Sequence, residues 1–149
     1  SSLRRAFIEP VLANHTAERL SKHQAVHAMT DISDGLHVDV SRLLEASKCS
    51  VLIDLANVPL SAELRAYAKQ TGVQAEELAL IGGEDYQLLV ACDVDYIETV
   101  QQDLIARSLK PLHVLGTLSD SGSGVSYCKQ GNDWAIRGEP FAHFVKKDS

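Results

Sequence analysis

The stretch AMTDISDGL at residues 28–36 decides the fold, because an apolar run there gives way to an acidic turn and then to an amphipathic pattern. This order is typical of a strand, a turn and a helix. Side chains at a strand end and a helix start converge outside the sheet, so we expect Asp31, Ser33 and Asp34 to face one region. One carboxylate suits the partial positive charge of a helix N-terminus, whereas two form an excess of negative charge that favours a cation.

The cation that suits these groups is Mg²⁺. It takes oxygen ligands at about 2.1 Å and usually keeps waters and phosphates in its shell. The sequence therefore predicts Asp31 and Asp34 as metal ligands beside a phosphate, with the hydroxyl of Ser33 donating to a phosphate oxygen. An alternative stays open at this point, in which Ser33 or Asp34 caps the helix and Asp31 is solvated at the strand end.

Length and composition narrow the class of protein. The chain has 149 residues, the size of one domain, and its 20 acidic against 14 basic residues give a net charge of −6. This balance, without a basic cluster, argues against nucleic acid and anionic membranes as partners. No apolar run reaches the roughly 20 residues of a bilayer span, and no signal-like segment follows the N-terminus, so we expect a cytoplasmic protein. Cys49, Cys92 and Cys128 are odd in number and far apart, which predicts reduced thiols.

The first half of the chain predicts a helical entry followed by a strand–helix–strand unit. Residues 1–24 form a lead-in helical segment interrupted by Pro10, and their abrupt start is typical of a chain cut from a longer one. A strand at 25–32, a helix from Leu36 and a strand at 50–55 then form a crossover. Such a crossover places the acidic turn at the carboxyl edge of the sheet, where ligands bind in this architecture.

The remaining pattern predicts an α+β domain that spans residues 1–149, with a mixed sheet and helices packed on it in layers. On the helix after the acidic turn, Asp39 and Arg42 fall outside the apolar face. On the last predicted helix, Ile105 falls on the core face. Further helices are predicted at 62–71 after the cap Ser61, at 75–80 and at 94–109, and further strands at 86–92, 112–118, 125–128 and 134–137, the last strands as two hairpins.

A second candidate motif is Gly82-Gly83-Glu84-Asp85-Tyr86. Two glycines before two acids give a backbone that can take positive φ and let a ligand approach, and Glu84 would accept hydrogen bonds from a cationic or amino-bearing ligand. In the alternative interpretation, Gly82 ends a helix and the acids are solvated turn residues. Phe141, in the aromatic tail, fits either a core plug or a ring stacked on a flat heterocycle.

The two motifs in this order, DISDGL at 31–36 and GGEDY at 82–86, resemble the C-terminal domain of thiamine-monophosphate kinases. That family belongs to a superfamily of ATP-using enzymes with aminoimidazole ribonucleotide synthetase, selenophosphate synthetase and a hydrogenase maturation protein. The resemblance covers essentially the whole chain and implies the layered, partly ferredoxin-like α+β fold of these C-terminal domains. Gln87 departs from the family, which commonly has glutamate after the tyrosine.

The resemblance implies a reaction and a role for each candidate residue. The family transfers the γ-phosphoryl group of ATP to thiamine phosphate with Mg²⁺, which gives thiamine diphosphate and ADP. By motif match, Asp31 and Asp34 would be magnesium ligands, and Ser33 would contact the nucleotide phosphates. Glu84 would contact the thiamine phosphate, and Phe141 would lie beside its ring system.

The resemblance also implies a partner. In the family a separate N-terminal domain supplies most of the ATP and metal contacts and forms a homodimer, and nothing similar to it stands in this sequence. We therefore expect the C-terminal half of a two-domain kinase, which folds but is inactive by itself. Two other functions stay open: a stand-alone binding domain of the same fold without catalysis, and a superfamily enzyme that acts on another phosphate acceptor.

Overall fold

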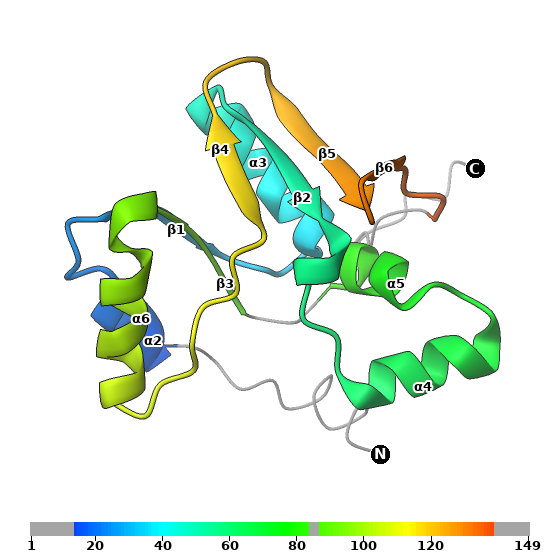
Figure 1. The fold of residues 1–149 in the computed structure, drawn as a ribbon, viewed down its shortest axis with the longest axis horizontal. Coiled ribbons are helices and arrows are strands. Elements are labelled where there is room, and N and C mark those ends of the chain that lie inside the picture. Colours follow the sequence, from blue (N-terminus) through cyan, green and yellow to red (C-terminus); the bar gives the residue numbers. More distant parts are fainter. Residues whose placement is uncertain (1–13, 84–86, 139–149) are drawn as a thin grey trace, which may run out of the picture.

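The computed structural model describes residues 14–83 and 87–138 of the chain. The predictions for Glu84, for Phe141 and for most of the lead-in segment lie outside the described residues. The elements follow the order α2 (Asn14–Leu20), β1 (Val26–Asp31), α3 (Leu36–Ser47), β2 (Ser50–Asp54), η1 (Leu55–Asn57), α4 (Ala62–Thr71), α5 (Ala75–Ile81), β3 (Leu88–Cys92), η2 (Val94–Tyr96), α6 (Ile97–Ala106), β4 (Gly116–Ser119), β5 (Gly124–Lys129) and β6 (Asn132–Trp134) (Figure 1).

The strands form two sheets. β1 and β3 pair antiparallel as a two-stranded sheet, and the other four strands have the order β4-β2-β5-β6. In the larger sheet β2 runs parallel to β5, while the β2–β4 and β5–β6 pairs are antiparallel. This mixed sheet with packed helices confirms the predicted α+β class.

Two predicted connections are wrong. The strand–helix–strand unit does not lie in one sheet, because β1 pairs with β3 whereas β2 pairs with β4 and β5. The loop at 120–123 is not a hairpin turn, since β4 and β5 lie on opposite sides of β2. The second hairpin is confirmed, with Gln130 and Gly131 at positive φ between β5 and β6. Hydrophobic periodicity identifies a strand but carries no information about its partner, which explains both errors.

Two separate clusters of buried side chains hold the fold. The larger one lies between α3 and the four-stranded sheet, where Leu44 and Ile53 are each 1% exposed, and the smaller one joins α2 and α6 to β1 and β3 around Leu20 and Leu104. The core position predicted for Ile105 is wrong, because its side chain is 60% exposed. Since α6 covers only two strands, the narrow stripe of residues around Leu104 is sufficient to cover them.

The structure confirms both helix ends predicted for α4. The Ser61 hydroxyl accepts a hydrogen bond from the Leu64 amide at 3.0 Å, and α4 ends at Gly72 in the left-handed conformation.

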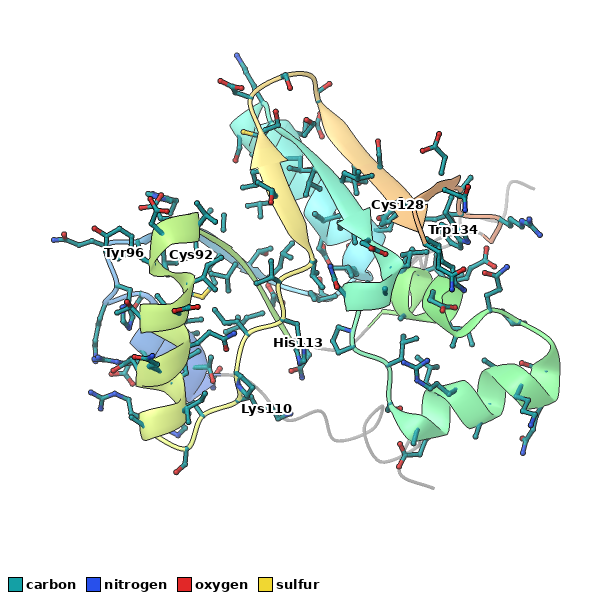
Figure 2. The ribbon with its side chains drawn as sticks, in the orientation of Figure 1. Cys92, Tyr96, Lys110, His113, Cys128 and Trp134 are labelled. Atoms are coloured by element: carbon teal, nitrogen blue, oxygen red, sulfur yellow. The ribbon has the colours of Figure 1, made fainter. Side chains whose placement is uncertain are left out.

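The three cysteines are free, as predicted, and Figure 2 shows Cys92 and Cys128 on different sheets. Among the helices that the structure describes, none combines the length and apolarity of a membrane span.

Candidate functional site

The acidic turn connects β1 to α3, as the sequence predicts. Asp31 is the last residue of β1 and is exposed, and the chain then turns through residues 32–35. The amide of Ile32 donates to the carbonyl oxygen of Gln87 at 2.8 Å, which extends the pairing of β1 with the chain before β3. The turn is therefore anchored at its entrance by the smaller sheet.

A buried carboxylate that sequence reasoning missed fixes the backbone of this turn. Asp39, in the first turn of α3, is 4% exposed, and its Oδ2 accepts hydrogen bonds from the amides of Ser33 at 2.8 Å and Asp34 at 2.9 Å. A carboxylate is rarely buried without such partners, so the amides explain its burial. The sequence did contain a signal for this role. Glycine precedes the helix and has no side chain that could accept hydrogen bonds from the free amides, so an acidic residue in the first turn can do so instead.

Arg42 adds a cation to the turn. Its guanidinium contacts the carboxylates of both Asp34 and Asp39, the latter at 3.0 Å. The hydrogen bond to Asp34 raises the pKa of Arg42 above its usual range. The residue at the N-cap position of α3 is Gly35, so the simple alternative in which Ser33 or Asp34 occupies that position is wrong.

The two motifs of the sequence meet where Gly35, of the acidic turn, packs against Gly82, of the glycine motif. Gly35 has φ 104°, and a Cβ added there would lie 2.9 Å from the carbonyl oxygen of Gly82 and 3.1 Å from that of Leu80. Gly82 ends α5 with φ −68°, and its amide donates to Leu78 at 2.9 Å. Gly82 thus ends a helix, as the alternative interpretation of this motif has it, and its φ is negative. Of these two glycines, the one that needs its conformational freedom is Gly35.

A second buried carboxylate ties the chain before the C-terminal tail to α5. Glu77 is 8% exposed, and its Oε1 accepts hydrogen bonds from the amides of Arg137 and Gly138, both at 2.6 Å. The helix that leads into the glycine motif and the segment that leads toward residue 139 are thus fixed to each other. Glu84 and Phe141 follow these two anchored segments but lie outside the described residues.

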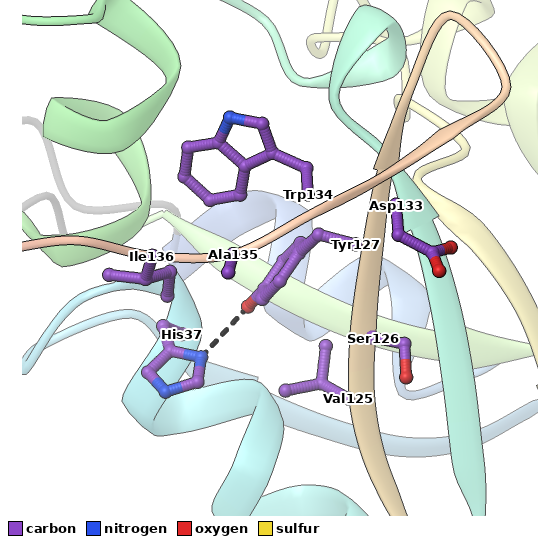
Figure 3. A pocket seen from close by; sticks show the side chains of 8 residues that line it. All are labelled: His37, Val125, Ser126, Tyr127, Asp133, Trp134, Ala135 and Ile136. Atoms are coloured by element: carbon purple, nitrogen blue, oxygen red, sulfur yellow. Dashed lines mark hydrogen bonds between the residues drawn. The ribbon is translucent and has the colours of Figure 1, made fainter.

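A pocket of about 440 Å³ opens beside the first turn of α3 (Figure 3). His37 Nδ1 lies 2.9 Å from the hydroxyl of Tyr127, whose ring meets Trp134 edge-on with 6.1 Å between the ring centroids. Burial lowers the pKa of His37 and raises that of Tyr127. The pocket therefore presents aromatic walls and an imidazole whose charged form is disfavoured by burial. Sequence reasoning had not singled out His37 or Tyr127. Its walls are formed by His37, Val125, Ser126, Tyr127, Asp133, Trp134, Ala135 and Ile136.

The donor set of the acidic turn fits part of a magnesium site. Asp31 offers an exposed carboxylate, and that of Asp34, which is 15% exposed, already contacts a cation in Arg42. Within 14–83 and 87–138, no three histidine, cysteine or acidic side chains gather closely enough to hold a metal ion. Because Mg²⁺ commonly takes one or two protein carboxylates and completes its shell with waters and phosphates, two carboxylates are compatible with it.

Most of the sequence matches a family model. Residues 6–129 match the description "AIR synthase related protein, C-terminal domain". The chain belongs to this family.

Individual relatives agree with the resemblance to thiamine-monophosphate kinases. The kinase of Haemophilus influenzae is 39% identical over 88 residues, which are 59% of this chain and 25% of that protein. The crystal structure of thiamine-monophosphate kinase from Stenotrophomonas maltophilia has a TM-score of 0.75 at 28% identity, over 89% of this chain and 40% of that one. AaThiL complexed with AMPPCP and TMP has a TM-score of 0.74 at 27% identity, over 96% of this chain and 41% of that one. The chain thus spans less than half the length of these relatives.

Proposed function

We propose that this chain is the C-terminal domain of an ATP- and Mg²⁺-dependent kinase that converts thiamine phosphate to thiamine diphosphate. The observation that carries the proposal is the likeness to AaThiL complexed with AMPPCP and TMP, which extends over 96% of this chain. AMPPCP is an analogue of ATP, and we interpret TMP as thiamine monophosphate, the substrate in the names of the curated relatives. A phosphoryl donor and a phosphate acceptor are the two substrates of such a kinase.

In this proposal the acidic turn binds the phosphates. Asp31 and Asp34 would hold Mg²⁺, and the hydroxyl of Ser33 would donate to a phosphate oxygen of the nucleotide. Mg²⁺ bound there would neutralise negative charge on the phosphates, which phosphoryl transfer requires. The support from the fold is that the turn follows a strand end and that Asp39 holds the amides of Ser33 and Asp34 in place.

The acceptor would be bound by the two residues that follow the anchored segments. We propose that Glu84 contacts the thiamine phosphate and that Phe141 lies beside its ring system. A carboxylate and an aromatic ring suit a cationic heterocycle. The support is the bond between Glu77 and the amides of Arg137 and Gly138, because it fixes the chain leading to Phe141 onto the helix that leads to Glu84.

The rest of the kinase would come from outside this chain. We infer that an N-terminal domain supplies further ATP and metal contacts, and that the complete protein is a homodimer in the cytoplasm. Two observations support the need for such a domain. The chain covers about 40% of the solved kinases. Among the residues that the structure describes, no group of three histidine, cysteine or acidic side chains could hold a metal ion by itself.

The test is an assay of the protein expressed from the complete reading frame that encodes this chain, with ATP, Mg²⁺ and thiamine phosphate. We expect thiamine diphosphate from the complete protein, none from the 149-residue chain alone, and none from the complete protein with Asp31→Asn. The variant Asp120→Asn, in the loop between β4 and β5, is the matched control and should keep full activity. Turnover of a different phosphate acceptor, or no ATP turnover by the complete protein, would contradict the proposal.

A further inference from the structure

Arg42 stands between two carboxylates with different surroundings. Its side chain is 61% exposed, whereas those of Asp34 and Asp39 are 15% and 5% exposed. A single exposed guanidinium therefore serves two largely covered carboxylates. Such an arrangement gives the arginine a second point of attachment if it leaves one of the carboxylates.

Asp39 is the fixed point of this group. Its Oδ2 is occupied by the amides of Ser33 and Asp34, and its Oδ1 accepts from Arg42 Nη1 at 3.0 Å. Movement of this carboxylate would leave two backbone amides without their acceptor, which is costly at a buried site. Asp39 thus retains Arg42 beside the turn whatever the state of Asp34.

The contact between Arg42 and Asp34 is of the kind that exchanges easily. One partner is a long side chain that is mostly in solvent, and ion pairs of this type contribute little because ordering the side chain offsets the attraction. A divalent cation has twice the charge of a guanidinium and binds carboxylate oxygens directly. Since both cations need the same carboxylate, they compete for it.

We propose that Arg42 is a displaceable counter-ion, which neutralises Asp34 in the metal-free protein and gives up this carboxylate when the acidic turn binds a divalent cation. During the exchange Arg42 stays attached through Asp39, so the turn keeps its backbone conformation and is never left with uncompensated negative charge. This inference rests on the proposed function in one respect, namely that Asp34 is a metal ligand. It adds that Arg42, on the helix α3 that follows the turn, sets the affinity for metal below its maximum.

The test is a calorimetric titration of the 149-residue chain with Mg²⁺ alone at low ionic strength. Removal of a competing cation should tighten metal binding, so we expect Arg42→Gln to lower the Kd about two- to fivefold, the range for an exposed ion pair. Arg107→Gln is the matched control, because Arg107 is similarly exposed and pairs with Asp103 on α6. Its Kd should equal that of the wild type.

A second measurement follows Arg42 itself. In nuclear magnetic resonance spectra, the Nε–Hε signal of Arg42 should shift on saturation with Mg²⁺, while that of Arg107 should not. A wild type that binds Mg²⁺ while Arg42→Gln binds it equally or more weakly would overturn the exchange and leave the metal site standing. A wild type that binds no Mg²⁺ would overturn the metal site as well, whereas the kinase proposal is decided separately by formation of thiamine diphosphate in the complete protein.

Discussion

Gly35 lies against Gly82 so closely that a Cβ on Gly35 would stand 2.9 Å from the Gly82 carbonyl oxygen. Gly35 begins α3 and Gly82 ends α5, so this contact fixes the start of one helix to the end of another. It is also the point at which the two motifs of the sequence meet, although they are distant along the chain. The glycine of the acidic turn is therefore required by packing as well as by its φ of 104°.

The first prediction concerns this contact. Gly35→Ala combines an unfavourable φ with a collision against backbone atoms, so we expect the free energy of unfolding to fall by about 2–4 kcal/mol in urea titrations. Gly72→Ala is the matched control, because Gly72 also has positive φ but a Cβ there meets nothing within 4 Å. It should cost about 1 kcal/mol. Equal losses in the two variants would show that the contact with Gly82 has no energetic role.

The second prediction concerns the buried carboxylate of the turn. Asp39→Ala leaves the amides of Ser33 and Asp34 without their acceptor, so we expect a loss of about 2–4 kcal/mol in the free energy of unfolding. Hydrogen exchange of those two amides should also become faster. Asp39→Asn should be milder, because the amide oxygen still accepts hydrogen bonds, and Asp120→Ala should change stability by less than about 0.5 kcal/mol. Unchanged exchange at Ser33 and Asp34 in Asp39→Ala would refute the assigned role.

The third prediction concerns the chain that leads to the C-terminal tail. In Glu77→Ala the amides of Arg137 and Gly138 lose the carboxylate that accepts from both, so their hydrogen exchange should accelerate. The neighbouring variant Glu76→Ala removes a carboxylate that pairs with Lys129 and should leave both amides protected. If the two variants exchange alike, the segment is held by other contacts.

The fourth prediction is a dependence of stability on pH. Asp103 on α6 accepts a hydrogen bond from Arg19 on α2 at 2.7 Å and another from His23 at 3.1 Å. The hydrogen bond from Arg19 is the main cause that holds the pKa of Asp103 far below its ordinary value. A carboxylate with a lowered pKa in the folded state contributes stability above its unfolded pKa of about 3.9, and this contribution is lost as pH falls toward the folded value.

Urea unfolding of the wild type and of Asp103→Asn should therefore differ by a constant amount near pH 5, and the difference should shrink steadily below about pH 4. Asp95→Asn, a substitution of the same kind at an exposed position, is measured in parallel as the control. A constant difference for Asp103→Asn down to pH 3 would contradict the prediction.

Those parts of the fold that depend on neighbouring residues were predictable from the sequence. The cap at Ser61, the helix end at Gly72 and the strand–turn–helix around Asp31 each follow from residues within a few positions. The pairing of β1 with β3 depends on residues far along the chain, which no local pattern specifies. For that reason two predicted connections, the crossover and the first hairpin, were wrong while most of the elements were right.

In the candidate site, too, the features set by neighbouring residues were predictable and those set by the folded chain were not. Sequence reasoning selected Asp31, Ser33 and Asp34 because two carboxylates beside a helix start are unusual. It missed Asp39, because a charged residue off the apolar face of a helix is usually exposed, and only the folded turn reveals the amides that bury it. It missed Arg42 for a related reason. Only the folded turn brings the Asp34 carboxylate next to the Arg42 guanidinium.

The most direct test of the account is whether the acidic turn binds Mg²⁺. Calorimetric titration of the 149-residue chain should show saturable binding in the wild type and in Asp120→Asn, and binding weaker by about tenfold or more in Asp31→Asn and in Asp34→Asn, because each loses a charged oxygen ligand. Equal affinity in all four proteins would place the metal elsewhere and contradict the central claim.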